Sequence, residues 1–424
     1  MVIEKFITYV ARKKNSRALR LTPYRSSVIP PRDGMTPMLL YVHVPFCEEL
    51  CPYCSFHRVP FEETLARDYF AALRQEIITY RNRGYRFNGV YIGGGTPTVL
   101  IDELQHTLQL ITESFAISEI SVETNPNHLT KVNLRALKTM GVNRLSVGIQ
   151  TFDDSLLRTV GRYDKYGSGE QIAERLLSTQ GIFDTLNADM MFNFPTQTMA
   201  VLERDLATLV RLGIDQITYY PLMEASYTRN IMRERLGVVD YTLEKAFYGK
   251  ITEMLGADYR PSTAWCFSRQ GGMIDEYVVT FDEYAGLGSG AFGYVGGSVY
   301  VNTFDIVDYI RRVVEGTPSV FAKKAFTTKE RLRYDLLMKL FALRVDLAQL
   351  KSKADGSVYR HLFPELLFFR LTGGLKQEGD VLTLTPKGQY YWVIMMREFF
   401  IGVNNFRDYC RRQLQMKTDT WVTT

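Results

Sequence analysis

The sequence lacks any hydrophobic run long enough to cross a membrane. A transmembrane helix needs about 18 consecutive, mostly apolar residues, and no stretch of the 424 residues approaches this length. The N-terminal segment also lacks the apolar core and small-residue cleavage site of a secretory signal. We therefore expect a protein that does not span a bilayer and stays in the cytoplasm.

The sequence also lacks a large excess of charge of either sign. The 51 Lys and Arg residues exceed the 46 Asp and Glu residues by only five, which at this length does not indicate a nucleic-acid partner. Cysteine is also rare, with five residues, three of which fall between 47 and 54. This distribution does not suit a disulfide framework and favours reduced thiols that act as ligands.

The sequence does contain a repeated alternation of predicted strands and helices. Strands are predicted at 39–46, 89–95, 119–125, 144–150, 186–193 and 216–223, with helices near 63–82, 101–114, 129–139, 170–178 and 200–212. Such alternation predicts a parallel sheet with right-handed crossovers. Six units are fewer than the eight of a complete barrel. The expected fold is therefore α/β, an incomplete six-stranded parallel β/α barrel with a mainly helical C-terminal domain.

The length favours more than one domain, and we divide the chain into four parts. Residues 1–37 form a basic N-terminal arm and linker, and residues 38–225 form the barrel core. Residues 226–326 form a barrel extension on the substrate side, helical at first and then rich in glycine. Residues 327–424 form the mainly helical C-terminal domain, with a small hairpin around 373–387.

The strongest local signal is Cys47, Cys51 and Cys54, directly after the first predicted strand. Three thiolates on one tight loop can hold three irons of a cubane cluster. The fourth iron then has no protein ligand, which is typical of catalytic rather than closed structural sites. A zinc site completed by His43 or His57 is an alternative.

Polar and glycine residues follow the later strands. The loop GGGTPT at 93–98 permits close approach to its backbone and exposes N–H groups. Glu123, Gln150 and Asp189 end successive strands, and Arg162 can pair with a carboxylate. Each alone is compatible with a capping or turn role, but together they predict a binding site at the C-terminal edge of the sheet.

These motifs resemble a known family. Residues 41–47 (YVHVPFC) with Cys51, Pro52, Tyr53 and Cys54 resemble the cluster loop of radical S-adenosylmethionine (SAM) enzymes. The further motifs GGGTPT (93–98), VETNPN (122–127), GVNRLSVGIQTFDD (141–154) and DMMFNFPTQT (189–198) resemble the oxygen-independent coproporphyrinogen III oxidase group, in order. The resemblance covers roughly residues 38–225, and a further similar segment is GLGSGAFG (286–293).

The resemblance implies a 4Fe-4S cluster on Cys47, Cys51 and Cys54 and a SAM molecule on its open iron. It implies a first SAM site formed by Tyr41, Gly94, Gly95, Thr96, Glu123, Gln150 and Arg162. It further implies a second SAM held by Tyr53, Gln150, Asp189, Met223 and Phe292. A flavodoxin- or ferredoxin-type protein would supply the electron.

Two differences from the oxidases favour another activity within the same group. Ser55 and Phe56 follow Cys54, where the oxidases carry a fourth cysteine, and residues 261–277 lack their Ser, His, Asn and Tyr-Trp pattern. The sequence therefore resembles most the class C radical SAM methyltransferases, which add a methyl group to an sp2 carbon of a flat aromatic substrate. Menaquinone at ring position 8 is the expected substrate. The alternatives are an anaerobic heme-degrading methyltransferase, a coproporphyrinogen III oxidase and a non-enzymatic heme-trafficking protein.

Two segments favour a lipid quinone. Ile3, Phe6, Ile7 and Val10 recur at helical spacing among basic residues, which predicts peripheral contact with the inner membrane surface. The apolar run 390–400 could seat an isoprenoid tail. In both cases packing within the fold is the alternative, and for the run it is the favoured one because aromatic stripes usually pack in a core.

Overall fold

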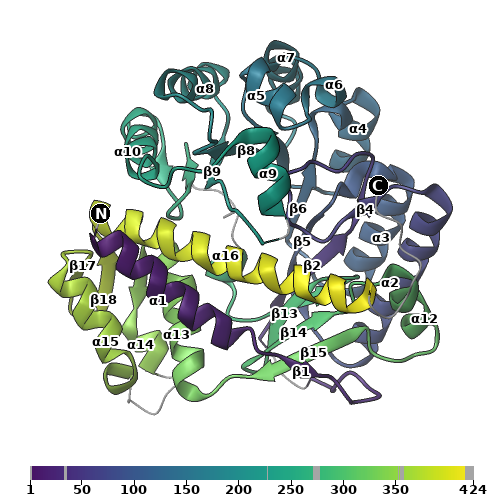
Figure 1. The fold of residues 1–424 in the computed structure, drawn as a ribbon. Helices are drawn as coiled ribbons and strands as arrows, with labels where there is room; N and C mark the ends of the chain where they lie inside the picture. Colours follow the sequence, from purple (N-terminus) through teal and green to yellow (C-terminus); the bar gives the residue numbers. More distant parts are fainter. Residues whose placement is uncertain are drawn as a thin grey trace.

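The centre of the molecule is a 13-stranded sheet whose middle is parallel (Figure 1). This computed structural model describes residues 2–32, 36–226, 228–270, 277–351, 353 and 358–415. The six central strands pair side by side in chain order: β2 (Met38–Val44), β5 (Phe87–Gly94), β6 (Glu119–Thr124), β7 (Arg144–Gln150), β8 (Thr185–Phe192) and β9 (Gln216–Pro221). All seven residues of β2 are buried, as expected for a strand covered on both faces. The predicted α/β fold class is confirmed.

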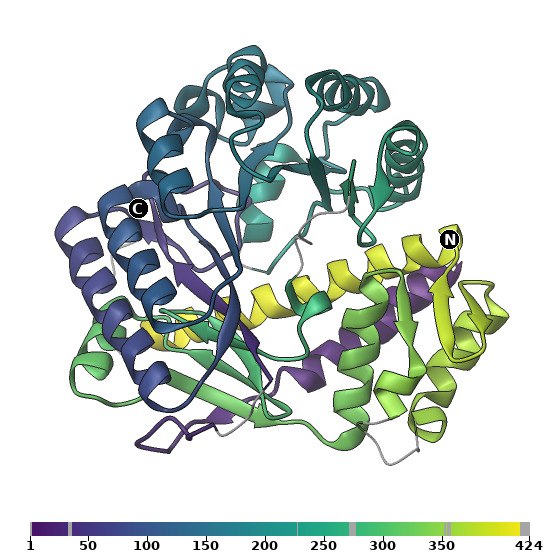
Figure 2. The ribbon, with the colours of Figure 1, turned by 180° about the vertical axis from the view of Figure 1, so that it is seen from behind.

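Helices connect these strands and cover the outer face of the sheet, as seen from both sides (Figures 1 and 2). They are α2 (Glu63–Asn82), α3 (Ile101–Ser114), α4 (Lys131–Thr139), α7 (Gly169–Thr179) and α8 (Met199–Leu212), with the shorter α5 (Asp154–Thr159) and α6 (Tyr163–Tyr166) between β7 and α7. Side-chain caps set several starts: Ser168 and Gln171 form a capping box on α7. The five predicted helices agree with these bounds to within two residues.

The sheet continues beyond the parallel core at both ends. At one end β12 (Tyr284–Leu287) pairs parallel with β2, followed by antiparallel β13 (Phe292–Val295), β14 (Ser298–Asn302), β15 (Val320–Ala325) and β1 (Thr22–Pro23). At the other end lie β11 (Cys266–Ser268) and β10 (Arg260–Pro261). In the described residues the end strands β1 and β10 do not pair with each other, so the barrel is open.

The remaining elements lie around this sheet. They are the short pair β3 (Phe46–Cys47) and β4 (Val59–Pro60), the 3-10 turns η1 (Pro97–Val99) and η2 (Pro126–His128), and the helices α9 (Thr228–Leu236), α10 (Glu244–Leu255), α11 (Tyr277–Thr280) and α12 (Ile306–Val314). The expected helical segment after the barrel core is therefore divided into α9 and α10. The strand β12 was not predicted, because its sequence lies in a glycine-rich stretch.

The C-terminal region is mainly helical, as predicted. It contains α13 (Thr328–Phe341), α14 (Leu347–Lys351), α15 (Val358–Leu371) and α16 (Pro386–Gln415), with a small sheet of β16 (Arg344–Asp346), β17 (Leu375–Glu378) and β18 (Val381–Leu384). The predicted hairpin is β17–β18. The division of the chain into four domains stays a prediction.

The last helix closes the open side of the barrel. In Figure 1, α16 crosses the molecule between the two ends of the sheet. Its Phe400 ring lies 5.8 Å from the ring of Trp265, next to β11, and its Phe406 ring lies 5.9 Å from Phe292 of β13. One helix therefore contacts both ends of the sheet and covers the gap that the missing barrel strands leave.

The N-terminal helix α1 (Val2–Ala18) packs beside α16 (Figure 1). Ile7 of the predicted apolar stripe is buried, whereas Phe6 is half exposed. Arg12 forms an ion pair with Glu398 of α16 at 2.5 Å, and Lys14 forms one with Glu365 of α15 at 2.6 Å. Part of the stripe thus packs within the fold, which was the alternative to membrane contact.

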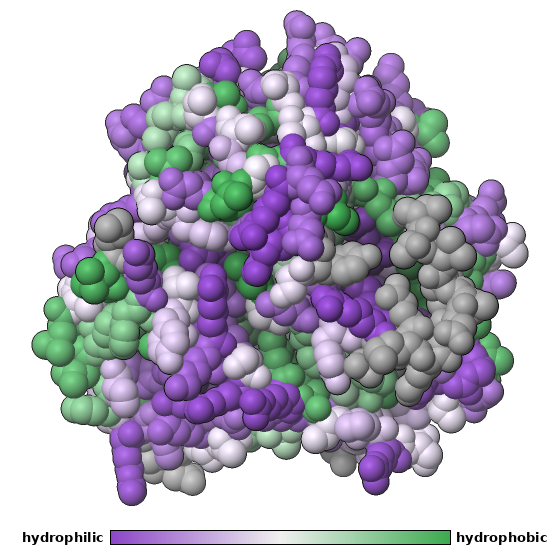
Figure 3. Space-filling view, in the orientation of Figure 1, coloured by the Kyte–Doolittle hydropathy of each residue, from purple (hydrophilic) through white to green (hydrophobic). Residues whose placement is uncertain are grey.

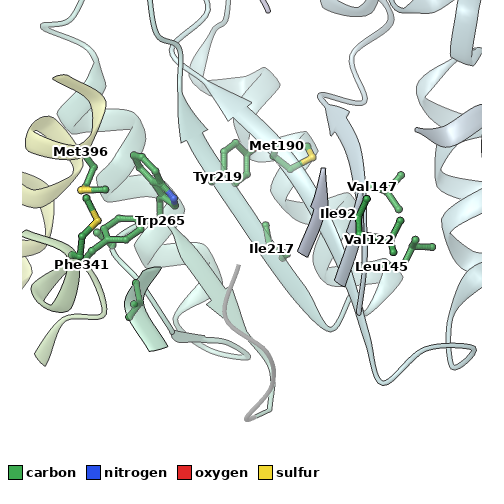
Figure 4. Packing of buried hydrophobic residues seen from close by; sticks show 14 of the residues in the cluster. Ile92, Val122, Leu145, Val147, Met190, Ile217, Tyr219, Trp265, Phe341 and Met396 are labelled. Carbon is green, nitrogen blue, oxygen red and sulfur yellow. The ribbon is translucent and has the colours of Figure 1, made fainter. Parts of the chain in front are cut away.

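The apolar run of α16 is largely core. Trp392, Val393 and Met396 are fully buried, and Met396 lies near Trp265 and Phe341 in the cluster that joins the C-terminal region to the barrel (Figure 4). Phe399 and Phe400, at the end of the run, face the cavities described below. In the part of the chain that the structure describes, no helix combines the length and apolarity needed to cross a bilayer.

Candidate functional site

The three clustered cysteines lie on a loop held by its own backbone. Cys47 ends β3, which pairs with β4 beyond the loop. The Cys54 N–H donates to the Cys51 carbonyl at 3.2 Å. The Arg58 guanidinium donates to the carbonyls of Cys51 and Cys54 at 2.5 and 2.7 Å. The thiol positions are therefore set by main-chain contacts and one arginine.

The glycine loop after β5 packs directly on this cysteine loop. The Gly95 N–H donates to Val44 O and the Thr96 N–H donates to Phe46 O, both at 2.7 Å. A Cβ at Gly95 would lie 2.5 Å from the Phe46 carbonyl oxygen. Gly94 has a φ of +117°, and a Cβ there would lie 2.6 Å from the His43 ring. Side chains at these two positions would force the loops apart.

One cavity of about 340 Å³ brings the predicted residues together. The predicted site residues that line it are Tyr41, Cys47, Cys51, Tyr53, Cys54, Gly94, Gly95, Glu123, Gln150, Arg162, Asp189, Met223 and Phe292. They come from the parallel strands and the loops that follow them, from the segment between α5 and α6 in the case of Arg162, and from β13. The exception is Thr96, which is buried behind the loop. Its hydroxyl lies 3.7 Å from Cys47 Sγ and accepts from Asn125 at 2.8 Å.

The carboxylates at the cavity are held by short hydrogen bonds. Glu123 accepts from the Tyr91 hydroxyl at 2.9 Å and from the Gly94 N–H at 3.0 Å. Asp189 accepts from the Ser146 hydroxyl at 2.7 Å and from the Asn187 amide at 2.8 Å. Both carboxylates are therefore oriented before any ligand binds.

Arg162 links the cluster loop to the strand ends. Its guanidinium donates to Cys51 Sγ at 3.6 Å, to the Tyr53 hydroxyl at 3.2 Å, to Asn125 Oδ1 at 3.3 Å and to the Gly148 carbonyl. Its Nε is buried without a hydrogen-bond partner. Arg162 therefore holds the cluster loop against the segment at the end of β7.

Comparisons with known proteins decide the family. The family model described as the radical SAM superfamily matches residues 41–217. The heme chaperone HemW of Bacillus subtilis (strain 168) is 32% identical over 363 residues, which cover 82% of this chain and 95% of that protein. The chain belongs to the coproporphyrinogen oxidase-like group of the radical SAM superfamily.

Further relatives agree with this assignment. The oxygen-independent coproporphyrinogen III oxidase of Escherichia coli (strain K12) is 27% identical over 391 residues, with 83% of each chain covered. A solved structure, described as coproporphyrinogen III oxidase (HemN) from Escherichia coli, a radical SAM enzyme, has the same fold. Its TM-score is 0.75 at 21% identity, and the match covers 90% of this chain and 95% of that one. The cofactors of this radical SAM chain are a 4Fe-4S cluster and SAM.

The residues present fit such a cluster better than a single metal ion. In the described residues, no group of three or more His, Cys, Asp or Glu side chains converges on a point where one ion could bind. A cubane gives each thiolate its own iron, so its ligands need not converge. Both ring nitrogens of His43 are within 2.8 Å of other partners, the Tyr41 hydroxyl and the His57 carbonyl. A zinc site completed by His43 therefore has no support in this geometry.

Burial has a consequence for cluster binding. It raises the pKa of the Cys47 thiol to about 11, and the nearby Cys54 thiol adds to this rise. The thiol is therefore protonated at neutral pH until the positive charge of iron compensates the thiolate. Cluster loading must release this proton.

The sequence predicted only part of the aromatic wall of the cavity, because Phe399 and Phe400 belong to the apolar run 390–400 that could seat an isoprenoid tail. This wall is aromatic and basic, with Tyr220, Trp265, Tyr284, Phe399, Phe400 and Arg407. These residues come from β9, from the segment before β11, from β12 and from α16, and they carry no common motif. Tyr91 and Asn125 were also missed, although each lies within three residues of a predicted site residue.

Proposed function

We propose that the chain is a radical SAM enzyme that acts on a flat aromatic substrate of the tetrapyrrole type. The observation that carries the proposal is that the three cluster thiols and a wall of aromatic rings line the same cavity. The names of the relatives support a tetrapyrrole, since they refer to heme and to coproporphyrinogen.

The proposed cofactor roles follow the position of each residue. Cys47, Cys51 and Cys54 would hold the cluster, and SAM would bind at the iron that has no thiolate ligand. Gly94 and Gly95 present backbone at the cavity, and Tyr41, Glu123, Gln150 and Arg162 complete the SAM site. Thr96 acts from behind through Cys47 and Asn125. When bound, the cluster supplies the electron that cleaves SAM to methionine and a 5′-deoxyadenosyl radical.

The chain itself positions the substrate and excludes water. Radical chemistry requires that the reacting hydrogen be held close to the radical and away from solvent. Helix α16 covers the open side of the barrel, and its Phe399 and Phe400 side chains line the same cavity as the cysteine loop. These rings offer a flat apolar surface on which an aromatic macrocycle can stack.

We propose a second SAM molecule and a methyl transfer as more specific features of this function. Tyr53, Gln150, Asp189, Met223 and Phe292 line the cavity and would hold that molecule. Methylation of menaquinone has less support than a tetrapyrrole substrate, because the relatives reported above are named for heme and coproporphyrinogen. Menaquinone therefore serves as a comparison substrate in the experiment.

A heme carrier is the second candidate function. It is favoured by the match to a heme chaperone over 95% of that protein's length. Reductive SAM cleavage separates the two candidates, because a carrier that performs no radical chemistry need not produce 5′-deoxyadenosine.

The decisive experiment is anaerobic reconstitution with iron, sulfide, dithionite and SAM, followed by chromatography for 5′-deoxyadenosine. We expect formation of this product by the unaltered chain and its loss in Cys47→Ala, Cys51→Ala and Cys54→Ala, because each substitution removes a ligand of one iron. Cys410→Ala is the matched control, since Cys410 is buried on α16 and is not among the residues that line the cavity. Full product formation by any of the three loop variants would contradict its role as a ligand.

Parallel incubations with coproporphyrinogen III, heme and menaquinone then identify the substrate by mass spectrometry. Loss of carbon dioxide from the porphyrinogen indicates an oxidase, and a gained methyl group indicates a methyltransferase. If heme binds but no 5′-deoxyadenosine forms with any substrate, the carrier function replaces the enzyme.

We further propose a flavodoxin- or ferredoxin-type electron donor and peripheral contact with a membrane. For the membrane the support is a group of exposed apolar side chains on α1 and α15, including Phe6, Phe363 and Leu371.

A further inference from the structure

A second cavity adjoins the cluster cavity. It has a volume of about 670 Å³ and lies among α1, α13, α16 and the strands β12 to β14. The two cavities share six lining residues, which are Tyr284, Phe292, Tyr334, Phe399, Phe400 and Arg407. The cavities therefore meet at one boundary, and a large flat molecule held near the cluster can extend across it.

The second cavity is basic at its outer side. Its described lining includes the basic residues Lys14, Arg17, Lys329, Arg333 and Arg407 and the acidic residues Glu330 and Glu365. Glu365 already pairs with Lys14 at 2.6 Å and with Arg333 at 2.8 Å. Glu330 pairs with Lys324 at 2.8 Å. The charge of this cavity is thus complementary to an anionic ligand.

Arg407 is the only basic residue among the six shared ones. It lies on α16 and is 7% exposed. Its Nη1 donates to Asn404 Oδ1 at 2.7 Å, and its guanidinium lies over the rings of Phe56 and Phe292 at 4.9 and 5.4 Å. An amide and two aromatic faces therefore hold the guanidinium in place at the boundary.

The positive charge of Arg407 reaches the groups around it. Burial lowers the pKa of His43 to about 4, and the charge of Arg407 acts in the same direction. Burial raises the pKa of Tyr284 to about 12, and here the charge of Arg407 opposes the rise. A carboxylate is the strongest partner for such a guanidinium, because it accepts two parallel hydrogen bonds from the fork.

We propose that Arg407 binds a carboxylate of the substrate at the boundary between the two cavities. The ligand class is a flat aromatic acid, with its ring among the shared aromatic side chains and its remaining carboxylates toward the basic side of the second cavity. This inference rests on the proposed function for the substrate's shape and adds the charge that the site selects. An uncharged quinone would cover the guanidinium with apolar surface and offer it no anionic partner.

The test compares an acid with its neutral ester on the cluster-loaded chain under anaerobic conditions. Coproporphyrin III and coproporphyrin III tetramethyl ester have the same ring, and quenching of porphyrin fluorescence reports binding of each. We expect the unaltered chain to bind the acid at least about tenfold more tightly than the ester, since a charge-assisted pair is worth that much or more. In Arg407→Gln this preference should fall several-fold, and the part that remains is due to the other basic side chains of the second cavity.

Two further variants make the result specific. Arg412→Gln removes an exposed arginine from the same helix and should keep the full preference for the acid. Arg407→Lys keeps the charge but loses the planar fork, so its preference should lie between those of the unaltered chain and Arg407→Gln. Binding of the ester by each variant reports that its cavity is intact.

Three outcomes would overturn the proposal: no preference in the unaltered chain, an undiminished preference in Arg407→Gln, or an equal loss in Arg412→Gln. If Arg407→Gln does not fold, a Lys variant that binds acid and ester equally also overturns it. These results are independent of SAM cleavage. A chain that forms no 5′-deoxyadenosine but selects the acid through Arg407 refutes the enzyme function and leaves the carboxylate site standing.

Discussion

Asp205 on α8 is a buried acid that the cofactor site does not use. It is 1% exposed and accepts hydrogen bonds from the Thr151 hydroxyl and the Phe152 N–H, both at 2.8 Å. These bonds hold the segment that follows β7, just beyond Gln150. Burial raises the pKa of this carboxyl to about 7, although both hydrogen bonds oppose the rise.

The Asp205 carboxyl predicts a loss of stability as pH rises. An aspartate in the unfolded chain has a pKa of about 3.9, so between about pH 4 and 7 the folded chain binds one proton more than the unfolded chain. Stability must therefore fall through this window, by up to a few kcal/mol. Asp205→Asn cannot ionise, and its melting temperature relative to the unaltered chain should rise from pH 5 to pH 7.5.

The control for Asp205 is Glu203→Gln on the same helix. Glu203 is exposed and forms an ion pair with Lys250 at 3.5 Å, so its variant should show no such trend. Scanning fluorimetry of the cluster-loaded proteins at both pH values measures the difference. A constant offset between Asp205→Asn and the unaltered chain would show that the carboxyl does not titrate in this range.

At the scale of elements, helix α16 joins parts of the chain that the sheet leaves separate. Arg397 of α16 forms ion pairs with Glu244 of α10 and with Glu398, the latter at 3.0 Å. Glu398 also binds Arg12 of α1. The side chains of Glu244, Arg397 and Glu398 are each at most 4% exposed. One buried charge network thus connects the barrel, the N-terminal helix and the C-terminal helix.

Replacement of Arg397, the central cation of this network, should lower the stability of the protein. Arg397→Met leaves the buried Glu244 carboxylate without its cation and leaves Glu398 with Arg12 alone, which costs about 3–5 kcal/mol. The double variant Arg397→Met with Glu244→Gln removes one of those charges, so it should be more stable than the single variant. Thermal unfolding measures both, and a double variant as unstable as the sum of its parts would exclude the coupling.

At the scale of the whole molecule, one exposed apolar surface lies outside the cofactor site. Tyr359, Phe363, Leu367 and Leu371 recur every fourth residue on α15, and all are at least 40% exposed. The Phe6 ring of α1 lies 5.5 Å from that of Phe368, so the start of α1 extends the same surface. Figure 3 shows apolar side chains gathered on the side where α15 lies. Exposed basic residues, Lys5 and Arg360, flank this surface.

This surface predicts binding to anionic vesicles. Phe363→Ser with Leu371→Ser should reduce co-flotation of the protein with phosphatidylglycerol vesicles several-fold, because both side chains lose apolar area that a lipid interface would cover. Val132→Ser with Val314→Ser is the control, since these two valines are each 73% exposed on α4 and α12. Equal flotation of the two double variants and the unaltered chain would refute membrane contact through α15.

The sequence by itself determined the features that depend on neighbours in the chain. The six parallel strands and the helices between them follow from local apolar periodicity, and the cluster loop follows from three cysteines within eight residues. Side chains at strand ends could be placed at one edge because parallel strands end on the same side. The family motifs identified the cofactors for the same reason, since each lies on one strand and its loop.

Only the tertiary structure decided what faces the cluster. Trp265, Tyr284 and Arg407 follow Cys47 by more than 200 residues and carry no motif, yet they line the same cavity. The position of α16 depends on contacts with both ends of an open sheet, and β12 forms because β2 offers it a free edge. Such contacts arise from packing between distant segments, and local periodicity carries no information about which distant segment will meet another.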